Sequence, residues 1–391
     1  MDNTLITNPL GILVVLVGSV SLFIFLERSL GLKLFNYFPS LVWIYVIPLI
    51  FSNIGVIPNE SPVYDWIRST ILPVLLIIML RDVDVVATIR IMGKGIFVML
   101  CGSTGVVIGA PITYLIVKRE LGPEIWKGFG ALAGSWIGGS ANLAAVGEGL
   151  KTNPADLGLA ILGDNLVYMV WIPILLASKT FTPLFNKFTK VDQKRIDMLE
   201  RSADDFVEDK GSIEMKHLLY LLFLGFTLTW LAELLAPYIP QYKPILTQSS
   251  WKILLITTFG IILSTTPAKK IPGGPQLSMV FLLTFLASMG ARANIREFIG
   301  QAPWFVLGAY IWIAIHGAFC ILGARLFRVD LASTAIASAA NIGGIATAPL
   351  IAACHNKKLV PVGVLMALIG YSIGTYGAFA AGWLCYLVSR I

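Results

Sequence analysis

The chain has 391 residues, of which 57% are hydrophobic and only 13% are charged. A water-soluble domain carries about 25% charged residues, so this composition excludes an ordinary soluble protein and indicates a membrane protein. The formal net charge of +7 falls in short loops. Basic residues in short loops typically orient a protein in the bilayer and contact anionic lipid headgroups. We therefore prefer this interpretation of the positive charge to binding of nucleic acid.

Apolar runs close to the ~20 residues that span a bilayer recur along the whole chain. They predict an all-α polytopic membrane protein with about twelve transmembrane helices, within a range of about eleven to thirteen. A transmembrane β-barrel would instead show alternating segments of about 10 residues. The predicted segments lie at about 10–27, 39–56, 64–80, 95–117, 127–148, 155–178, 217–237, 251–265, 275–290, 302–326, 333–353 and 359–388.

A polar stretch divides the chain into two halves. We expect a first repeat over 1–178, a linker over 179–216 and a second repeat over 217–391. Four apolar residues of the linker recur at helical spacing and predict a surface amphipathic helix, either solvated or bound to the membrane. These residues are Ile196, Leu199, Ala203 and Phe206.

The two halves resemble each other at two places. The first pair aligns "IIMLRDVDVVATI" (77–89) with "LASMGARANIREFI" (286–299), and the second aligns "WIGGSANLAAV" (136–146) with "NIGGIATAPLI" (341–351). An internal repeat of about 200 residues is typical of a transporter whose site lies between pseudo-symmetric halves. Six crossings per half would make the repeats parallel, whereas the basic loops favour inverted repeats, so the topology stays open.

The stretch "GSWIGGSANL" (134–143) is poor material for a membrane helix, because glycines, serines and an asparagine weaken it at mid-depth. Its counterpart carries the same Gly-Gly pair and an amide. Such breaks supply carbonyls for a cation and a helix N-terminus for an anionic group, although small residues also suit close helix packing. The candidate ion ligands are Ser140, Asn142 and Asn341, and the candidate solute-binding residues are Ser135, Gly138, Gly139, Gly343, Gly344 and Thr347.

A carboxylate lies inside the segment 155–178. Asp164 is about 13 Å from its start at 1.5 Å per residue, where a charge is costly unless it is paired or neutralised. We expect Asp164 to face a cavity and to titrate or bind a cation, with sodium between Asp164 and Asn142 as one arrangement. The alternative is a carboxyl group bonded to a neighbouring helix. Further candidates nearby or in the second half are Asn165, Tyr168, Tyr371, Ser372 and Thr375.

Other ionisable groups in apolar segments are weaker candidates for the site. His316 lies in mid-segment, where it is either a neutral histidine bonded to a neighbouring helix or part of a proton relay. Glu148 follows the first glycine-rich segment and is expected at its mouth, and Glu233 is expected near a helix end at the interface. The four cysteines lack metal-ligand spacing and are interpreted as small reduced hydrophobes.

The motifs "GSWIGGSANLAAV", "GDN" and "NIGGIATAPLIAA" resemble those of the cation:proton antiporter/anion transporter superfamily. They look most like a bacterial family labelled as domain of unknown function 819. The resemblance implies two discontinuous helices that cross at 127–148 and 333–353, with the coupling carboxylate on the following helix, as at Asp164. It also implies scaffold helices at about 10–80 and 217–290, mobile core helices at about 95–178 and 302–391, elevator-type alternating access and a homodimer.

We therefore expect a secondary active transporter, coupled to sodium or protons, for a small polar organic solute such as an amino acid, short peptide or carboxylate. The resemblance also implies a basic residue on the second-half helix of electrogenic antiporters, and this residue is absent here. Its absence disfavours the alternative of a monovalent cation/proton antiporter. A channel or an intramembrane enzyme is more remote, because the histidines lack catalytic or metal spacing. The expected partners are the bacterial inner membrane, the solute, the coupling ion and a second copy of the chain, with no cofactor beyond a sodium ion.

Overall fold

The computed structural model describes residues 4–30, 40–82, 93–192, 211–293, 295–356 and 359–391, and every regular element in these ranges is helical apart from one isolated β-bridge between Tyr242 and Leu246. The first half contains α1 (Pro9–Leu30), α3 (Ser40–Asn53), α4 (Pro62–Trp66), η1 (Ile67–Ile71), α5 (Leu72–Leu80), α7 (Gly95–Val117), η2 (Lys118–Glu120), α8 (Trp126–Gly138), α9 (Ser140–Gly149), α10 (Pro154–Ala177), η3 (Ser178–Phe181) and α11 (Thr182–Thr189). The second half contains α13 (Met215–Leu235), η4 (Ala236–Tyr238), α14 (Gln248–Ser264), η5 (Pro267–Lys270), α15 (Gly274–Arg292), α16 (Ile295–Phe327), α17 (Leu331–His355) and α18 (Val360–Ser389).

Eight helices in the described ranges are long and apolar enough to cross a membrane. Two shorter apolar helices, Trp43–Asn53 and Leu331–Ile345, fall below that length. Each of the twelve predicted segments overlaps a helix or a run of consecutive helices. The all-helical, polytopic architecture therefore agrees with the sequence, while a total of twelve crossings stays a prediction.

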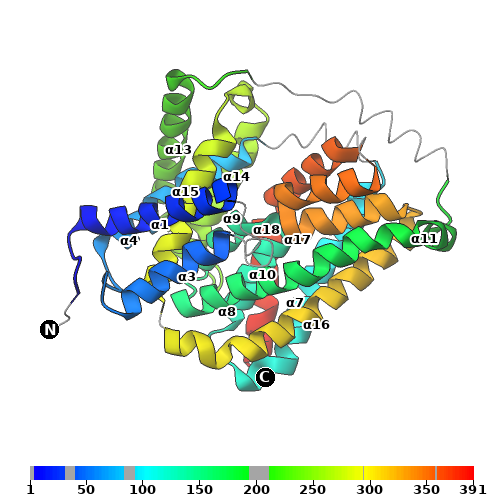
Figure 1. Cartoon of the computed structure of the whole chain (residues 1–391), viewed down its shortest axis with the longest axis horizontal. Coiled ribbons are helices and arrows are strands. Elements are labelled where there is room, and N and C mark those ends of the chain that lie inside the picture. Colours follow the sequence, from blue (N-terminus) through cyan, green and yellow to red (C-terminus); the bar gives the residue numbers. More distant parts are fainter. Residues whose placement is uncertain (1–3, 31–39, 83–92, 193–210, 294, 357–358) are drawn as a thin grey trace.

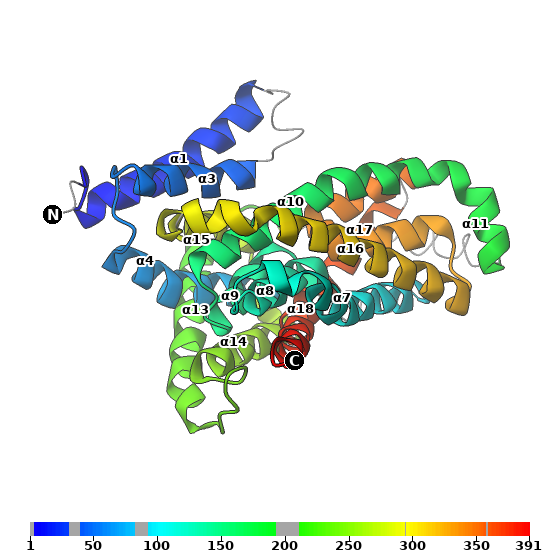
Figure 2. The same ribbon diagram turned by 90° about the horizontal axis from the view of Figure 1, so that it is seen from below.

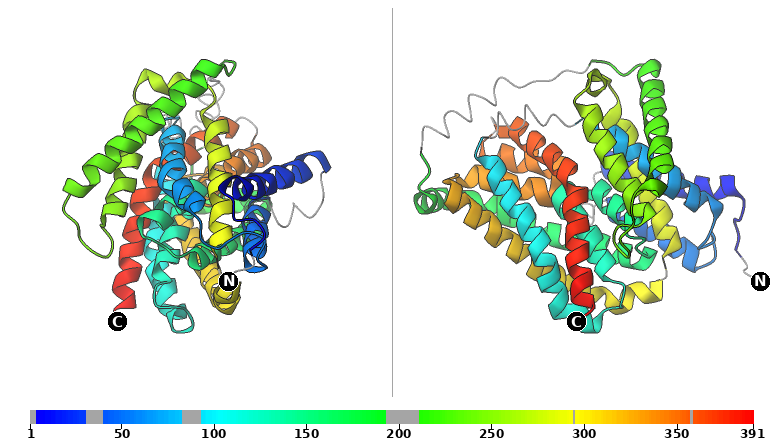
Figure 3. Two further views of the ribbon diagram at one scale, coloured as in Figure 1. Left: turned by 90° about the vertical axis from the view of Figure 1, so that its left-hand side faces the viewer. Right: turned by 180° about the vertical axis from the view of Figure 1, so that it is seen from behind.

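The helices pack in two groups, and each group takes helices from both halves of the chain (Figures 1 and 3). We call α1, α3, α4, α5, α13, α14 and α15 the flanking group, because these helices contact one another at one side of the molecule. We call α7, α8, α9, α10, α16, α17 and α18 the central group. The groups meet where α9 and α18 contact α5 and α14, where α10 contacts α3 and α15, and where α16 contacts α3.

The linker is described only at its two ends. Its first part forms α11, which packs on α16 and α17, with the Arg325 guanidinium 5.5 Å from the centre of the Phe188 ring. The amphipathic helix predicted around residues 196–206 lies outside the described residues.

Capping residues set where the helices of the central group begin. The Asn153 side chain accepts a hydrogen bond from the Asp156 backbone N–H at 2.8 Å, and Pro154 occupies the first helical position of α10. Asp330 accepts in the same way from the Ser333 N–H at 2.8 Å at the start of α17. Side-chain acceptors at N-caps and proline at the first position both favour helix initiation. These starts place Asp164 near the middle of the 24-residue α10.

The backbone departs from helical geometry at two glycines of the central group. Gly139 separates α8 from α9 with φ 78° and ψ 177°, and Gly344 lies inside α17 with φ 58° and ψ −147°. Positive φ values are accessible to glycine at little cost because it has no Cβ. Both positions belong to the Gly-Gly pairs of the predicted repeat.

Gly290 allows α15 to pack directly on the backbone of α3. A Cβ at this position would collide with the Tyr45 carbonyl group, so we expect Gly290→Ala to destabilise the protein by about 1–3 kcal/mol, the usual cost of overpacking. Gly18→Ala in α1 is the matched control, because a Cβ there meets nothing within 4 Å and alanine favours a helix by up to ~1 kcal/mol. Thermal unfolding in detergent measures both variants, and equal melting temperatures would contradict the close packing.

Candidate functional site

A cavity of about 420 Å³ lies between the two helix groups. Figure 2 shows α8 and α9 at the centre of the molecule, and these helices form one wall together with α10, α17 and α18. α5 and α15 of the flanking group form the opposite wall. The lining residues are Leu75, Met79, Asp82, Ser135, Gly139, Ser140, Ala141, Asp164, Asn165, Tyr168, Pro275, Ser278, Met279, Leu282, Ile342, Gly343, Ile345, Thr347, Leu368 and Tyr371.

Asp164 reaches the cavity from α10 and is held by two donors on α8. The Ser135 hydroxyl donates to Asp164 Oδ2 at 2.7 Å, and Trp136 Nε1–H donates to Oδ1 at 2.9 Å. Trp136 is fully buried, and its ring centre lies 4.8 Å from that of Trp312 on α16. Among the described residues no basic side chain forms an ion pair with Asp164. The carboxylate is therefore oriented by hydrogen bonds but not compensated by a positive charge.

Tyr371 on α18 lies between the two glycine interruptions. A Cβ on Gly139 would be 2.7 Å from a ring carbon of Tyr371, and one on Gly344 would be 3.3 Å from its hydroxyl oxygen. The Tyr371 side chain also makes a hydrogen bond with the backbone of Ile345. Nearby, the Tyr168 hydroxyl lies 2.9 Å from Thr347 Oγ1. The structure thus brings both Gly-Gly segments and α10 to one place.

Asn142 lies behind the cavity wall and connects α8, α9 and α18. Its amide donates to the carbonyl groups of Gly138 at 2.8 Å and Tyr371 at 3.1 Å, and its Oδ1 accepts from the Thr375 hydroxyl at 2.6 Å. The side chain is fully buried and does not line the cavity. In this arrangement the amide satisfies the backbone at the interruption rather than facing Asp164.

His316 and Asn341 form a second buried polar cluster, between α7, α16 and α17. His316 Nδ1 lies 3.0 Å from the Gly102 carbonyl and Nε2 lies 3.0 Å from Ser338 Oγ. A carbonyl can only accept, so Nδ1 carries the proton. Asn341 donates to the Met99 carbonyl at 3.2 Å and to Ser103 at 3.3 Å. This is the geometry of a histidine bonded to neighbouring helices, and neither residue lines the cavity.

The predicted site residues fall into two sets, those that line the cavity at Asp164 and those packed around it. Nine of them line the cavity, namely Ser135, Gly139, Ser140, Asp164, Asn165, Tyr168, Gly343, Thr347 and Tyr371. The others lie in the surrounding packing, namely Gly138, Asn142, His316, Asn341, Gly344, Ser372 and Thr375.

The flanking wall holds an acidic residue that the sequence analysis did not select. Asp82 Oδ1 lies 2.7 Å from the Arg81 guanidinium, which is 1% exposed and also donates to the carbonyl groups of Ala268 and Ile271. Burial lowers the pKa of Arg81 from its usual value, and the Asp82 carboxylate acts in the opposite direction. Because guanidinium groups stay protonated in proteins, Asp82 is compensated. The sequence feature that could have pointed to Asp82 is the charged run "RDVD", which begins directly after α5.

A smaller cavity of about 180 Å³ surrounds Glu148 at the far end of α9. Arg68 Nε lies 3.4 Å from Glu148 Oε2, and Arg292 lies 3.4 Å from Asp65. Arg68 and Asp65 belong to the η1 and α4 helices of the flanking group. The expected position of Glu148 at a mouth therefore corresponds to an ionic contact between the two groups.

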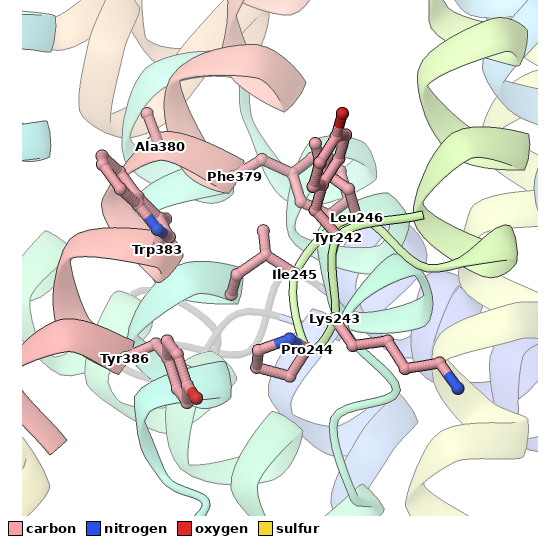
Figure 4. A pocket seen from close by; sticks show the side chains of 9 residues that line it. All are labelled: Tyr242, Lys243, Pro244, Ile245, Leu246, Phe379, Ala380, Trp383 and Tyr386. Carbon is pink, nitrogen blue, oxygen red and sulfur yellow. The ribbon is translucent and has the colours of Figure 1, made fainter. Parts of the chain in front are cut away.

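Another cavity, of about 320 Å³, lies between the α13–α14 connection and α18 (Figure 4). Aromatic and aliphatic side chains form its wall, and Lys243 points away from the other lining residues. The described residues that line it include no carboxylate and no side-chain amide. The cavity at Asp164 is therefore the better candidate for recognition of a polar ligand.

The long apolar helices define an integral, multi-pass membrane protein. The chain belongs to the family described as protein of unknown function (DUF819), which it matches over residues 12–387. It is also similar to the uncharacterized membrane protein YjcL of Bacillus subtilis (strain 168), with 25% identity over 350 aligned residues. The aligned region covers 86% of this chain and 87% of YjcL. The wider likeness to the cation:proton antiporter/anion transporter superfamily stays a prediction.

Substitution of Gly139 tests whether the stability of the protein depends on the interruption between α8 and α9. We expect Gly139→Ala to cost about 1–3 kcal/mol from strained φ and further from contact with Tyr371. Gly93→Ala is the matched control, because Gly93 also has positive φ (50°) but a Cβ there meets nothing within 4 Å. Melting temperatures in detergent compare the two, and an equal loss would show that Tyr371 does not fill the space beside Gly139.

Proposed function

We propose that this protein is a secondary active transporter, coupled to sodium or protons, for a small polar organic solute. The observation that carries the proposal is the cavity between the helix groups, which contains Asp164 and both interrupted segments. Ionisable groups inside a membrane protein are costly and mark ion or substrate pathways. Paired interruptions in corresponding segments of two repeats are typical of transporter sites.

The cavity is large for a bare ion. Its volume of about 420 Å³ falls in the range of about 300–1,000 Å³ found for small-molecule sites. The lining combines hydroxyl, amide and carboxylate groups with apolar side chains. This composition supports an organic solute over plain exchange of monovalent cations.

We assign the coupling ion to Asp164. Hard cations prefer oxygen ligands, and the lining offers the Asp164 carboxylate with the hydroxyl groups of Ser135 and Ser140. Asn165 donates to the Ile161 carbonyl at 2.7 Å, so its side-chain oxygen remains an acceptor. Asn142 lies behind this group and would hold the wall rather than the ion.

The packing supports a movement of the central group against the flanking group. In this proposal the flanking group is the scaffold and dimer interface, the two groups each combine inverted repeats, and α8–α9 and α17 are the two discontinuous helices. Polar contacts between the groups near the far end of α9 include Arg68 with Glu148, the Ser250 hydroxyl with the Gly149 carbonyl at 2.9 Å, and the Tyr45 hydroxyl with the Pro154 carbonyl at 2.7 Å. Two more join α14 to α18, where Thr257 contacts Thr375 at 3.3 Å and Thr258 contacts Tyr376 at 2.8 Å. An elevator-type step would break these contacts.

Removing the charge of Asp164 tests the coupling. We expect Asp164→Asn to lower ion-driven uptake into proteoliposomes at least tenfold, because the neutral amide cannot compensate a cation. Glu233→Gln is the matched control, since Glu233 is a carboxylate on α13 whose side chain is 64% exposed, and it should transport normally. Full ion dependence in Asp164→Asn would refute the assigned role.

The same assay separates the alternatives. Exchange of sodium or potassium for protons without any organic substrate would establish a monovalent cation/proton antiporter. Flux that never exceeds equilibrium and does not saturate would establish a channel. Saturable uptake against a solute gradient supports the proposed transporter.

A further inference from the structure

The charges of the cavity wall at Asp164 restrict the ligand. Among the described lining residues, two are carboxylates and none is Lys, Arg or His. Asp82 is compensated by Arg81 at 2.7 Å. Within the described residues, Asp164 receives hydrogen bonds from two neutral donors, Ser135 and Trp136. The wall therefore has one negative charge without a basic partner.

Asp164 retains capacity for a positively charged ligand. An ionised carboxylate offers about four lone-pair positions, and the Ser135 and Trp136 donors use two of them. A buried charge without a partner of opposite sign is strongly unfavourable. A cation in the cavity would remove this cost, whereas an anion would add a second negative charge to it.

The remainder of the cavity favours an organic body over a hydrated ion. Its apolar lining includes Met279, Leu282, Ile342, Ile345 and Leu368. Two aromatic rings, those of Tyr168 and Tyr371, complete this wall, and aromatic faces attract cationic groups. The volume of about 420 Å³ far exceeds the ~30 Å³ of one water molecule.

We infer that the solute of this cavity carries a positively charged amino group that pairs with Asp164, on a body with apolar surface. The inference rests on the proposed function, which assigns this cavity to the solute. It narrows the expected solutes to those with an ammonium group, such as amino acids, short peptides and amines. It excludes simple carboxylates.

A second consequence concerns the direction of coupling. Two cations beside one uncompensated carboxylate would repel each other in a medium of low dielectric. The solute and the coupling ion therefore occupy Asp164 alternately, and the protein exchanges one for the other. The other titratable or charged groups facing Asp164 in the described lining are Asp82 of the flanking wall, Tyr168 and Tyr371, with Arg81 behind Asp82.

Amino-acid derivatives that carry either the ammonium group or the carboxylate group, on the same side chain, test which charge the cavity recognises. Leucinamide and phenylalaninamide carry only the ammonium group, whereas N-acetyl-leucine and N-acetyl-phenylalanine carry only the carboxylate. We expect the amides to raise the melting temperature of the purified full-length protein in detergent, and the N-acetyl acids to leave it unchanged. A tenfold increase in the coupling ion, sodium or protons, should weaken amide binding several-fold.

Variants assign the effect to Asp164. Asp164→Asn should bind the amides at least tenfold more weakly and lose the ion dependence, while Glu233→Gln should keep wild-type amide affinity and ion dependence. Asp164→Glu keeps the negative charge on a longer side chain, so it should keep the ion dependence but bind the amides with a shifted affinity. Size-exclusion chromatography without ligand verifies that each variant is folded, and if Asp164→Asn is not, Asp164→Glu with a shifted amide affinity serves in its place.

Several results would overturn the inference: stronger binding of the N-acetyl acids, no binding of either amide, or equal amide binding by Asp164→Asn. Amide binding strengthened by the coupling ion would overturn the exchange. Uptake assays keep this inference separate from the transport proposal. Amides that bind but are never transported would refute transport alone, and ion-driven uptake of N-acetyl-leucine would refute the ammonium recognition alone.

Discussion

The carboxylate of Asp164 lies near the middle of an apolar helix, with two hydrogen-bond donors and no basic partner among the described residues. A charge at this depth is tolerated only where protein or a cavity surrounds it. Both donors come from consecutive residues of α8, so they fix the rotation of α8 relative to α10. The tilted contact of the Trp136 ring with the Trp312 ring extends this restraint to α16. The organisation of the central group thus follows from how one carboxylate is accommodated.

The interruption beside Asp164 is held by specific contacts. Breaking a helix inside a membrane protein frees backbone groups that need partners. Asn142 satisfies the Gly138 and Tyr371 carbonyl groups and is itself held by Thr375, while the Tyr371 ring fills the space beside Gly139 and Gly344. Because these contacts all lie within the central group, the cavity wall keeps its shape if the two helix groups move. The polar contacts between the groups, such as Arg68 with Glu148 and Thr257 with Thr375, are the ones that movement would change.

The candidate site residues that could be identified from the sequence are those that are unusual among their immediate neighbours in the chain. An aspartate inside an apolar run and a Gly-Gly pair beside serines are unusual wherever they occur, so Asp164, Ser135 and Gly139 could be selected without a fold. Asp82 and Ser278 could not, because their position in the cavity depends on how α5 and α15 pack against the central group. Asn142 and Asn341 were selected as amides beside the two Gly-Gly pairs, and His316 as an ionisable group in mid-segment. Each turns into the packing between helices, which depends on helix rotation that no local pattern specifies.

The amino-acid composition and the apolar runs are enough to establish that this protein lies in a bilayer and is helical, because there each backbone group must find a partner within its own helix. They also establish that a carboxylate and two glycine pairs lie within apolar segments. That these features share one cavity follows from the fold, since residues about 200 positions apart meet through packing of side chains and not through any local preference. The charge of that cavity also depends on the fold, because Arg81 compensates Asp82 but nothing basic among the described residues reaches Asp164.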